Sequence, residues 1–205
     1  MGAEQTRSRE NTRARLLEAA AEVFAEVGIA GASVEAICDR AGFTRGAFYS
    51  NFETKDQLFL ELSAAAGSRQ LERVRSRIAQ VESETEPSDG RDIRSLLRVL
   101  DTLGASRDDT ILSVESELRA MRDSEFGAAL IAQYERFVDE VTAIVEQVLR
   151  NRHIELRVDA GFAARVLMTT WDSTARNGVI AGLPEEERNR ASHEAVARMA
   201  EALIA

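Results

Sequence analysis

The sequence predicts an all-α protein, and two observations support this fold class. Only two of the 205 residues are proline and 5% are aromatic, a composition that favours helix over strand. Apolar residues also recur at intervals of three and four along most of the chain, which is the spacing of a buried helix face. A chain of this length, with 44% hydrophobic and 30% charged residues, can bury a core as one extended domain or as a small head and a larger body.

The first predicted helix extends from about residue 9 to residue 27. Its apolar stripe consists of Leu16, Ala20, Val23, Phe24 and Val27. Gly28 followed by Ile29 has the sequence form of a Schellman stop, in which glycine adopts a left-handed conformation and the next apolar residue folds back onto the helix. The helix is therefore expected to end at Gly28.

Two short helices joined by a tight turn are expected next. Ser33 is a good N-cap for the first, which Gly42 ends after about two turns. Its apolar face is formed by Val34, Ile37, Cys38 and Ala41. Thr44 caps the second, residues 44–52, in which Phe48 and Phe52 lie one turn apart and point inward. A helix-turn-helix with a polar second helix is a means of placing side chains against DNA bases in the major groove.

Lys55, the only lysine of the chain, stands in the first turn of a fourth predicted helix, residues 55 to about 81. Thr54 and Gln57 form a capping box at its start. A cation there opposes the helix dipole, but a DNA phosphate docked at the same terminus would account for it. A solvated surface lysine is the alternative interpretation.

The formal net charge of −9 does not exclude a nucleic-acid partner, because a DNA contact depends on local charge. Residues 1–55 carry seven basic and eight acidic side chains, so −8 of the net charge lies in the remaining 150 residues. Arg7, Arg9, Arg13 and Arg15 form a basic cluster near the N-terminus. Either additional DNA contacts or a solvated helix start would explain this cluster.

A polar loop is expected at residues 82–90, followed by helical segments at about 91–103, 110–121, 125–152, 159–181 and 185–203. The last two segments are separated by Gly182 and Pro184 and are expected to form an antiparallel hairpin. Small residues along both helices permit close packing, so two such hairpins could form a four-helix dimer interface. Burial within one chain explains the same pattern.

The residues that punctuate the first four helices have a specific joint spacing between about residues 9 and 62. They are Gly28, Ser33, Ile37, Ala41, Gly42, Gly46, Phe48, Tyr49, Phe52, Lys55 and Leu58. In this pattern the chain resembles the TetR/AcrR family of bacterial transcriptional regulators. The resemblance implies an all-helical homodimer with about nine helices. Residues 1–55 would be a three-helix DNA-binding domain, and residues 56–205 a helical effector-binding and dimerisation domain.

The resemblance also implies which residues meet DNA, namely Thr44, Arg45, Gly46, Ala47, Tyr49, Asn51 and Lys55. Tyr49 and Lys55 would contact phosphates, Gly46 would allow close approach to the backbone, and the others would lie near bases or adjacent phosphates. Arginine can pair bidentately with guanine, and a tyrosine hydroxyl can donate to phosphate. Asn51 stands where the family often has histidine or another aromatic residue, so its partner is left open.

The resemblance implies a homodimeric repressor that binds double-stranded, palindromic operator DNA and is released by an unidentified small-molecule effector. Dimerisation would use the last two helices, about residues 159–203. An activator, or a regulator that responds to a protein partner, fits the same pattern. The alternative from a different class is a helical enzyme or ligand carrier whose head only mimics the motif.

The effector pocket is expected among the helices of about residues 60–180. Its candidate wall residues are Phe126, Tyr134, Phe137, Phe162, Met168 and Trp171. Trp171 is the strongest, because Thr169, Thr170, Asp172 and Asn177 supply polar surroundings that could orient a ligand. Ordinary core packing is the alternative for each of the six.

Other classes of function have no support in the sequence. The chain has neither a run of about 18 apolar residues nor the apolar core of a signal peptide, so a cytoplasmic protein without a membrane partner is expected. Cys38 is a lone cysteine, and His153 and His193 lack ligands at metal-binding spacing, so no disulfide or metal site is expected. Without a nucleophile elbow, P-loop, dinucleotide fingerprint or HExxH signature, no enzyme activity or cofactor is expected.

Overall fold

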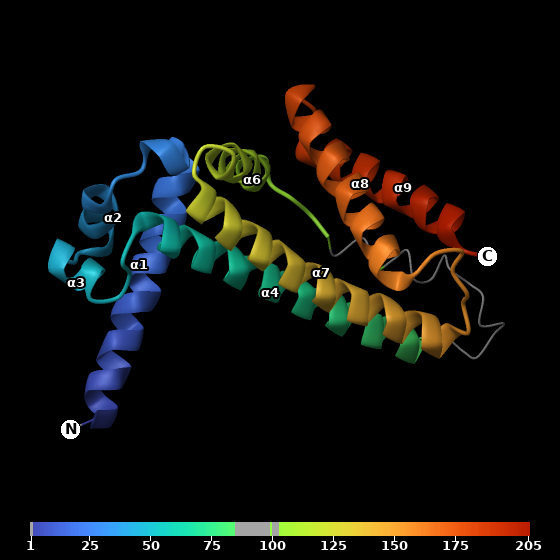
Figure 1. Ribbon diagram of the computed structural model, residues 1–205, viewed down its shortest axis with the longest axis horizontal. Coiled ribbons are helices and arrows are strands. Elements are labelled where there is room, and N and C mark those ends of the chain that lie inside the picture. Colours follow the sequence, from blue (N-terminus) through green and yellow to red (C-terminus); the bar gives the residue numbers. More distant parts are fainter. Residues whose placement is uncertain (1, 85–98, 100–102) are drawn as a thin grey trace. The chain divides into compact units, whose positions relative to one another are not determined.

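The computed structural model describes residues 2–84, 99 and 103–205, with side chains from residue 9 onward (Figure 1). These residues form eight helices: α1 (Gly2–Gly31), α2 (Val34–Ala41), α3 (Arg45–Tyr49), α4 (Lys55–Glu84), α6 (Arg107–Ala120), α7 (Ser124–Arg152), α8 (Ala160–Ile180) and α9 (Glu185–Leu203). The only extended pairing in the described part of the chain is a single bridge between Leu156 and Ile204. The all-α prediction is confirmed.

Most predicted helix ends lie within a few residues of the observed ones. The recognition helix candidate α3 is shorter than predicted: it ends at Tyr49, and Asn51 N–H donates to Phe48 O, three residues back, in the tighter spacing of a turn. In contrast, α4 continues to Glu84, past its predicted end at residue 81. The helix predicted at 91–103 and most of the loop predicted at 82–90 lie outside the described residues.

The chain divides into two compact units. The first consists of Met1–Ala66 and Ile111–Gln133, and the second of Gly67–Thr110 and Tyr134–Ala205. The first unit therefore contains the helix-turn-helix together with most of α6 and the start of α7. These units are defined by packing, so the functional division predicted at residue 55 stays a prediction.

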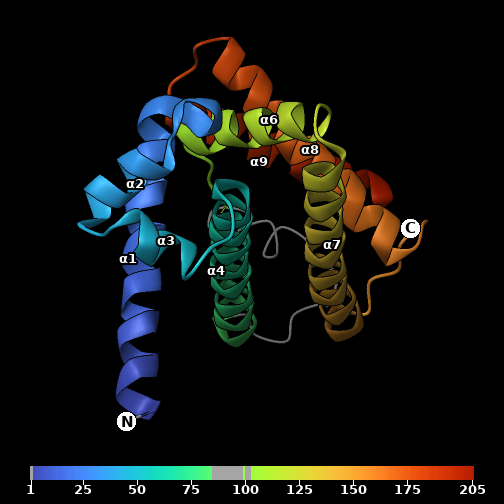
Figure 2. The same ribbon diagram turned by 60° about the vertical axis from the view of Figure 1, so that its left-hand side comes forward.

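The core of the first unit is built from α1, α2, α3 and the start of α4, with Phe126 of α7 added. Figures 1 and 2 show α2 and α3 lying beside α1. Phe24 packs edge-to-face on Phe59, with ring centroids 5.5 Å apart. The largest fully buried side chains of this core are Leu16, Phe24, Ile29, Ile37, Phe48, Phe52 and Leu58. Each such side chain stabilises the fold by about 1.5–3 kcal/mol relative to an exposed one.

The regular geometry of α1 breaks at Gly28, where the sequence predicts the helix to end, but the helix resumes and continues to Gly31, so the predicted Schellman stop is not formed. Gly28 has φ 72° and ψ 174°, a backbone region that is essentially restricted to glycine. The break frees the N–H of Ile29 from the helix, and Glu115 Oε2 of α6 accepts it at 2.6 Å. The N–H that the break in α1 exposes is thus satisfied by a side chain that lies 86 residues further along the chain.

The second unit contains the predicted antiparallel hairpin of α8 and α9, which lie side by side in Figures 1 and 2. Its turn contains Gly182 at φ 70° and Pro184. Ala163, Ala164, Ala175 and Gly178 are the buried residues of α8. The side chain of Arg188 lies directly over Gly178, where an added Cβ would come within 2.8 Å of Arg188 Cγ. Small residues therefore allow the close packing that the sequence predicts.

Polar side chains on α9 hold the segment that leads into α6. Asn189 Oδ1 accepts a hydrogen bond from Ala105 N–H at 3.4 Å, and Arg188 donates to Ala105 O at 3.4 Å. The ring of His193 contacts Leu103 O through Nε2 at 3.0 Å. Three residues from two turns of α9 thereby fix the backbone of residues 103–105.

We predict that Gly28→Ala destabilises the protein more than Gly182→Ala does. Both replacements force alanine into a positive φ, which costs about 1–2 kcal/mol. At Gly28 the new Cβ would also lie 2.5 Å from Glu115 Oε1, whereas nothing lies within 4 Å at Gly182. Thermal unfolding followed by circular dichroism compares the two variants. Equal losses of stability would show that Glu115 does not pack against Gly28.

Candidate nucleic-acid interface

The helix α3 is held by two phenylalanines that point into the first unit. Phe48 is 0% and Phe52 1% exposed, and their ring centroids lie 5.7 Å apart. Thr44 caps the helix, because its Oγ1 accepts a hydrogen bond from Ala47 N–H at 3.3 Å. The burial predicted for both phenylalanines is confirmed. With these rings inward, the helix presents its other side to solvent.

Arg45 and Tyr49 lie on this exposed side. The guanidinium carbon of Arg45 is 6.0 Å from the centre of the Tyr49 ring, and its NH1 is 2.7 Å from Glu35 Oε1. A hydrogen bond with Tyr49 and the charge of Glu35 raise the pKa of Arg45. All three side chains are about half exposed or more. They form a polar group at the surface that joins the first turn of α2 to α3.

The smaller residues of the predicted contact set differ in accessibility. Gly46 is exposed, and an added Cβ would meet only Thr44 Oγ1 at 3.7 Å, so internal packing does not require glycine there. Asn51 is half-buried, and its Nδ2 donates to Ala47 O at 2.8 Å. Its Oδ1 is buried and has no hydrogen-bond partner in the described structure. A DNA contact by Asn51 would require its amide to turn away from α3.

Three arginines of α1, Arg9, Arg13 and Arg15, bind backbone carbonyls at the ends of the next two helices, whereas the side chain of Arg7 lies outside the described residues. Arg9 donates to Ser50 O at 2.9 Å, and Arg13 donates to Asn51 O at 2.8 Å. Arg13 also pairs with Glu61 and lies 4.4 Å from the centre of the Phe52 ring. These contacts satisfy carbonyl groups that the end of a helix leaves without partners.

Arg15 performs the same task for α2, donating to Ala41 O at 2.8 Å and lying over the ring of Phe43. The sequence predicts DNA contacts or a solvated helix start for this cluster, and the binding of helix-end carbonyls by Arg9, Arg13 and Arg15 is not among these expectations. The signal that could have revealed it is the spacing of Arg9 and Arg13. They stand four residues apart, on one face of the helix that also buries Leu16.

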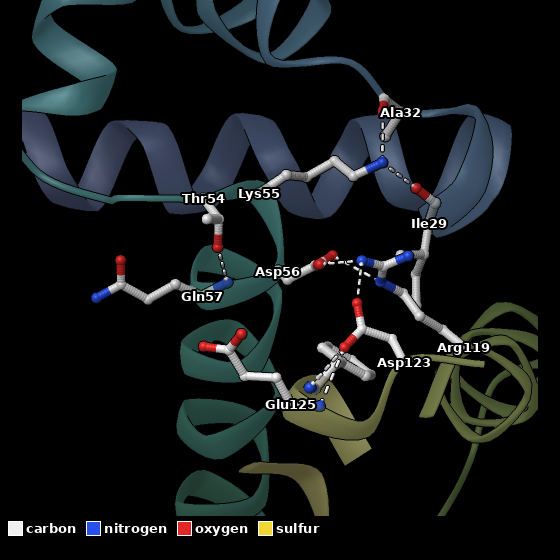
Figure 3. A network of polar contacts seen from close by, with 10 residues as sticks. Ile29, Ala32, Thr54, Lys55, Asp56, Gln57, Arg119, Asp123 and Glu125 are labelled. Carbon is white, nitrogen blue, oxygen red and sulfur yellow. Dashed lines mark hydrogen bonds and ion pairs between the residues drawn. The ribbon is translucent and has the colours of Figure 1, made fainter. Parts of the chain in front are cut away.

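Lys55 makes two hydrogen bonds inside the first unit (Figure 3). Its Nζ donates to Ile29 O at 2.6 Å and to Ala32 O at 2.8 Å, both at the end of α1. Burial lowers the pKa of Lys55, Asp56 opposes this shift, and the charge of Arg119 adds to it. The solvated-lysine interpretation is therefore wrong. The predicted phosphate contact stays a prediction. Two N–H groups of the Lys55 ammonium bind carbonyls, so the third is left for a phosphate.

The capping box at the start of α4 is present in a modified form. Thr54 Oγ1 accepts from Gln57 N–H at 3.0 Å, as predicted. In the reciprocal bond, Gln57 Oε1 accepts from the N–H of Glu53 at 2.6 Å rather than from that of Thr54. The cap fixes the direction in which α4 leaves the helix-turn-helix.

An ion-pair network beside Lys55 ties α6 to α4 within the first unit (Figure 3). Arg119 Nε donates to Asp56 Oδ1 at 3.0 Å, and its NH2 donates to Asp56 Oδ2 and, at 3.3 Å, to Asp123. Asp123 Oδ1 accepts from the first N–H groups of α7, at Glu125 and Phe126. No pattern in the sequence connects these helices, so sequence reasoning missed this network.

A profile of the bacterial regulatory proteins of the tetR family matches residues 16–62. This segment covers most of α1, all of α2 and α3, and the first turns of α4. This match supports the assignment of the chain to the TetR/AcrR family. The arrangement around α3 thus corresponds to the helix-turn-helix of this family.

Individual relatives agree with this assignment. An uncharacterised HTH-type transcriptional regulator of Mycobacterium tuberculosis is 32% identical over 112 residues, which are 55% of this chain. The chain spans about half, 55%, of that relative's length. The HTH-type transcriptional repressor AcnR of Corynebacterium efficiens is 39% identical over 64 residues, which are 31% of this chain and 34% of that protein. A TetR-family regulator from Mesorhizobium loti has a TM-score of 0.71 over 96% of this chain and 98% of that one. At 21% identity this likeness shows the fold alone.

The effector-pocket candidates of this chain are divided between the two units. Phe126 belongs to the first unit, where it is buried against Phe59. In the second unit, Phe137 packs against a cluster of buried apolar residues that includes Leu71 of α4 and Ile144 of α7, and Phe162 is exposed. Trp171 stacks on His193 with ring centroids 5.4 Å apart. Tyr134 is exposed and Met168 half-buried, both in the second unit.

The described residues supply neither a membrane span nor a metal cluster. None of their helices is both long enough and apolar enough to cross a bilayer. They contain no group of three or more His, Cys, Asp or Glu side chains that could hold a metal ion.

We predict that Lys55→Met lowers the stability of the protein. Methionine keeps much of the apolar stem but leaves Ile29 O and Ala32 O without their donor, which costs about 1–3 kcal/mol. Arg75→Met is the matched control on the same helix, because its exposed ion pair with Glu140 contributes about 0–1 kcal/mol. Urea unfolding measures the loss in the free energy of unfolding for both variants. A Lys55→Met loss no larger than that of Arg75→Met would contradict the structural task of Lys55.

Proposed function

We propose that this chain is a homodimeric transcriptional repressor that binds palindromic, double-stranded operator DNA through α2 and α3. The observation that carries the proposal is the exposed pair of Arg45 and Tyr49 on a short helix anchored by buried Phe48 and Phe52. Such a helix can enter the major groove without unfolding its own support. The similarity to a protein named as a transcriptional repressor supports the direction of regulation.

Each exposed residue has a role that matches its chemistry. Arg45 can pair with guanine O6 and N7 through two parallel N–H groups, and Thr44 can bond a base or a phosphate. Tyr49 can donate its hydroxyl to a phosphate. Gly46, which internal packing does not require, leaves room for the DNA backbone. Lys55 can add one N–H to a phosphate, while its other two hold the end of α1.

Dimerisation is proposed through α8 and α9. Phe162 and Ile180 are 52% and 78% exposed on α8. They stand 18 residues apart, which is about five helical turns, so both lie on one face. Thr169 and Ser173 lie between them at helical spacing and are small enough for close helix approach. Pairing this face with its symmetry mate would remove two large apolar side chains per chain from water.

We propose that a small-molecule effector binds in the helices C-terminal to the helix-turn-helix and causes the protein to release DNA. The protein is proposed to act in the cytoplasm. Five of the six candidate wall residues belong to the second unit. Trp171 is the strongest of them, because its half-buried ring stacks on His193 beside Thr170 and Asp172. A ligand there would have both an aromatic surface and polar groups within reach.

Selection of DNA from a random pool with the full chain tests the proposed function, and we expect enrichment of a palindrome. Arg45→Ala should then lose about 1–3 kcal/mol of binding on the enriched site and relax the base preference. Arg122→Ala, which removes an exposed charge outside the helix-turn-helix, serves as the control and should keep that preference. Failure of the wild-type protein to enrich any sequence would contradict the regulator function.

We predict that Ile180→Glu weakens the dimer by roughly tenfold or more, because it places an unpaired charge in the proposed apolar contact. Sedimentation velocity over a range of protein concentrations measures the dissociation constant. Met121→Glu is the control, since Met121 is 81% exposed and belongs to the first unit. An unchanged dimer in Ile180→Glu would exclude this face of α8 from the interface.

A further inference from the structure

We propose that Glu35 determines the sequence specificity of the interface and that it acts through Arg45. This inference rests on the proposed DNA-binding function and assigns a role to an acidic residue for which that function has no use. A carboxylate on a surface that approaches DNA is repelled by phosphates, so its position there calls for a physical reason.

The ion pair between Glu35 and Arg45 is built from two neighbouring helices. Glu35 lies in the first turn of α2, and Arg45 opens α3. Glu35 Oε1 and Arg45 NH1 are 2.7 Å apart, with side chains 55% and 61% exposed. The other cation of this helix pair, Arg40, is bound to Glu22 and Glu26 of α1 at 2.9 and 2.8 Å. Arg45 is thus the cation that α2 and α3 offer to DNA, and Glu35 holds it.

The stability of the fold does not account for this pair. An exposed ion pair contributes about 0–1 kcal/mol, because water screens the charges and two long side chains lose freedom. The N-cap of α2 does not use Glu35 either, since Ser33 Oγ accepts the N–H of Ala36. The carboxylate is therefore free to act on the direction and availability of the Arg45 guanidinium.

A guanidinium carries five N–H donors in a rigid fork. One edge can stay on Glu35 while another pairs with guanine O6 and N7, so the correct base lets Arg45 keep both partners. At a wrong base, Arg45 could bind only by turning to a phosphate, which leaves Glu35 unpaired and close to the negative DNA backbone. Glu35 thereby penalises incorrect sequences more than the correct one, which is how a repulsive group creates specificity.

The experiment compares the full chain and its variants on two duplexes, the site enriched from the random pool and a scrambled duplex of equal length and composition. We expect Glu35→Gln to strengthen binding to the scrambled duplex and to lower the specificity ratio roughly tenfold, the factor that corresponds to about 1.4 kcal/mol. The salt dependence on the scrambled duplex should steepen by about one unit, because the released Arg45 neutralises one more phosphate.

Asp39→Asn is the matched control. Asp39 lies one turn after Glu35 on the exposed surface of α2, and no ion pair of its carboxylate is found among the described residues. Its removal changes the charge of the helix equally without releasing Arg45, so both duplexes should gain affinity alike and the ratio should stay within about twofold. Circular dichroism melts establish that all variants are folded.

The Arg45→Ala background decides whether Glu35 acts through Arg45. There, adding Glu35→Gln should leave the specificity ratio unchanged. A similar fall of the ratio with and without Arg45 would show that Glu35 reads DNA directly and would overturn the proposal. An unchanged ratio in the single Glu35→Gln variant would also overturn it. These outcomes are separate from the failure of wild-type protein to bind any DNA, which would refute the proposed function itself.

Discussion

Burial of Phe48 and Phe52 is the interaction on which the candidate interface depends. The candidate recognition helix α3 has five residues, far fewer than an isolated helix needs in water. Its position therefore comes from two fully buried rings and from the arginines of α1, which satisfy carbonyl groups of Ser50 and Asn51. These contacts hold the opposite surface in a defined direction while Arg45 and Tyr49 remain accessible.

Cations near the helix-turn-helix are used mainly for structure rather than for surface charge. Arg13, Arg15 and Lys55 all donate to carbonyls at helix ends. A buried or half-buried carbonyl without a donor costs more free energy than an exposed ion pair returns. These three basic side chains therefore make the helix-turn-helix more rigid, although the sequence alone suggests that they could contact DNA. Of the two cations of α2 and α3, Arg40 is bound to α1, and Arg45 is paired with Glu35 instead.

The helix-turn-helix is completed by residues far from it in sequence. Glu115 accepts the N–H that the break at Gly28 exposes, and Arg119 pairs with Asp56 next to Lys55. These contacts explain why the first compact unit includes Ile111–Gln133 in addition to the first 66 residues. In the proposed function, any change in the position of α6 would act on the end of α1 through Glu115 and on the start of α4 through Arg119.

Local patterns in the sequence determined the helices, their caps and their buried faces. Ser33, Gly42 and Thr44 act as predicted because capping depends on residues within one turn. The family assignment followed from the same local spacing. Tertiary structure alone decided the partners of Lys55, of the α1 arginines and of Gly28, and it divided the six pocket candidates between two units. The physical reason is that long, flexible side chains choose acceptors by proximity in space, which the order of residues along the chain does not encode.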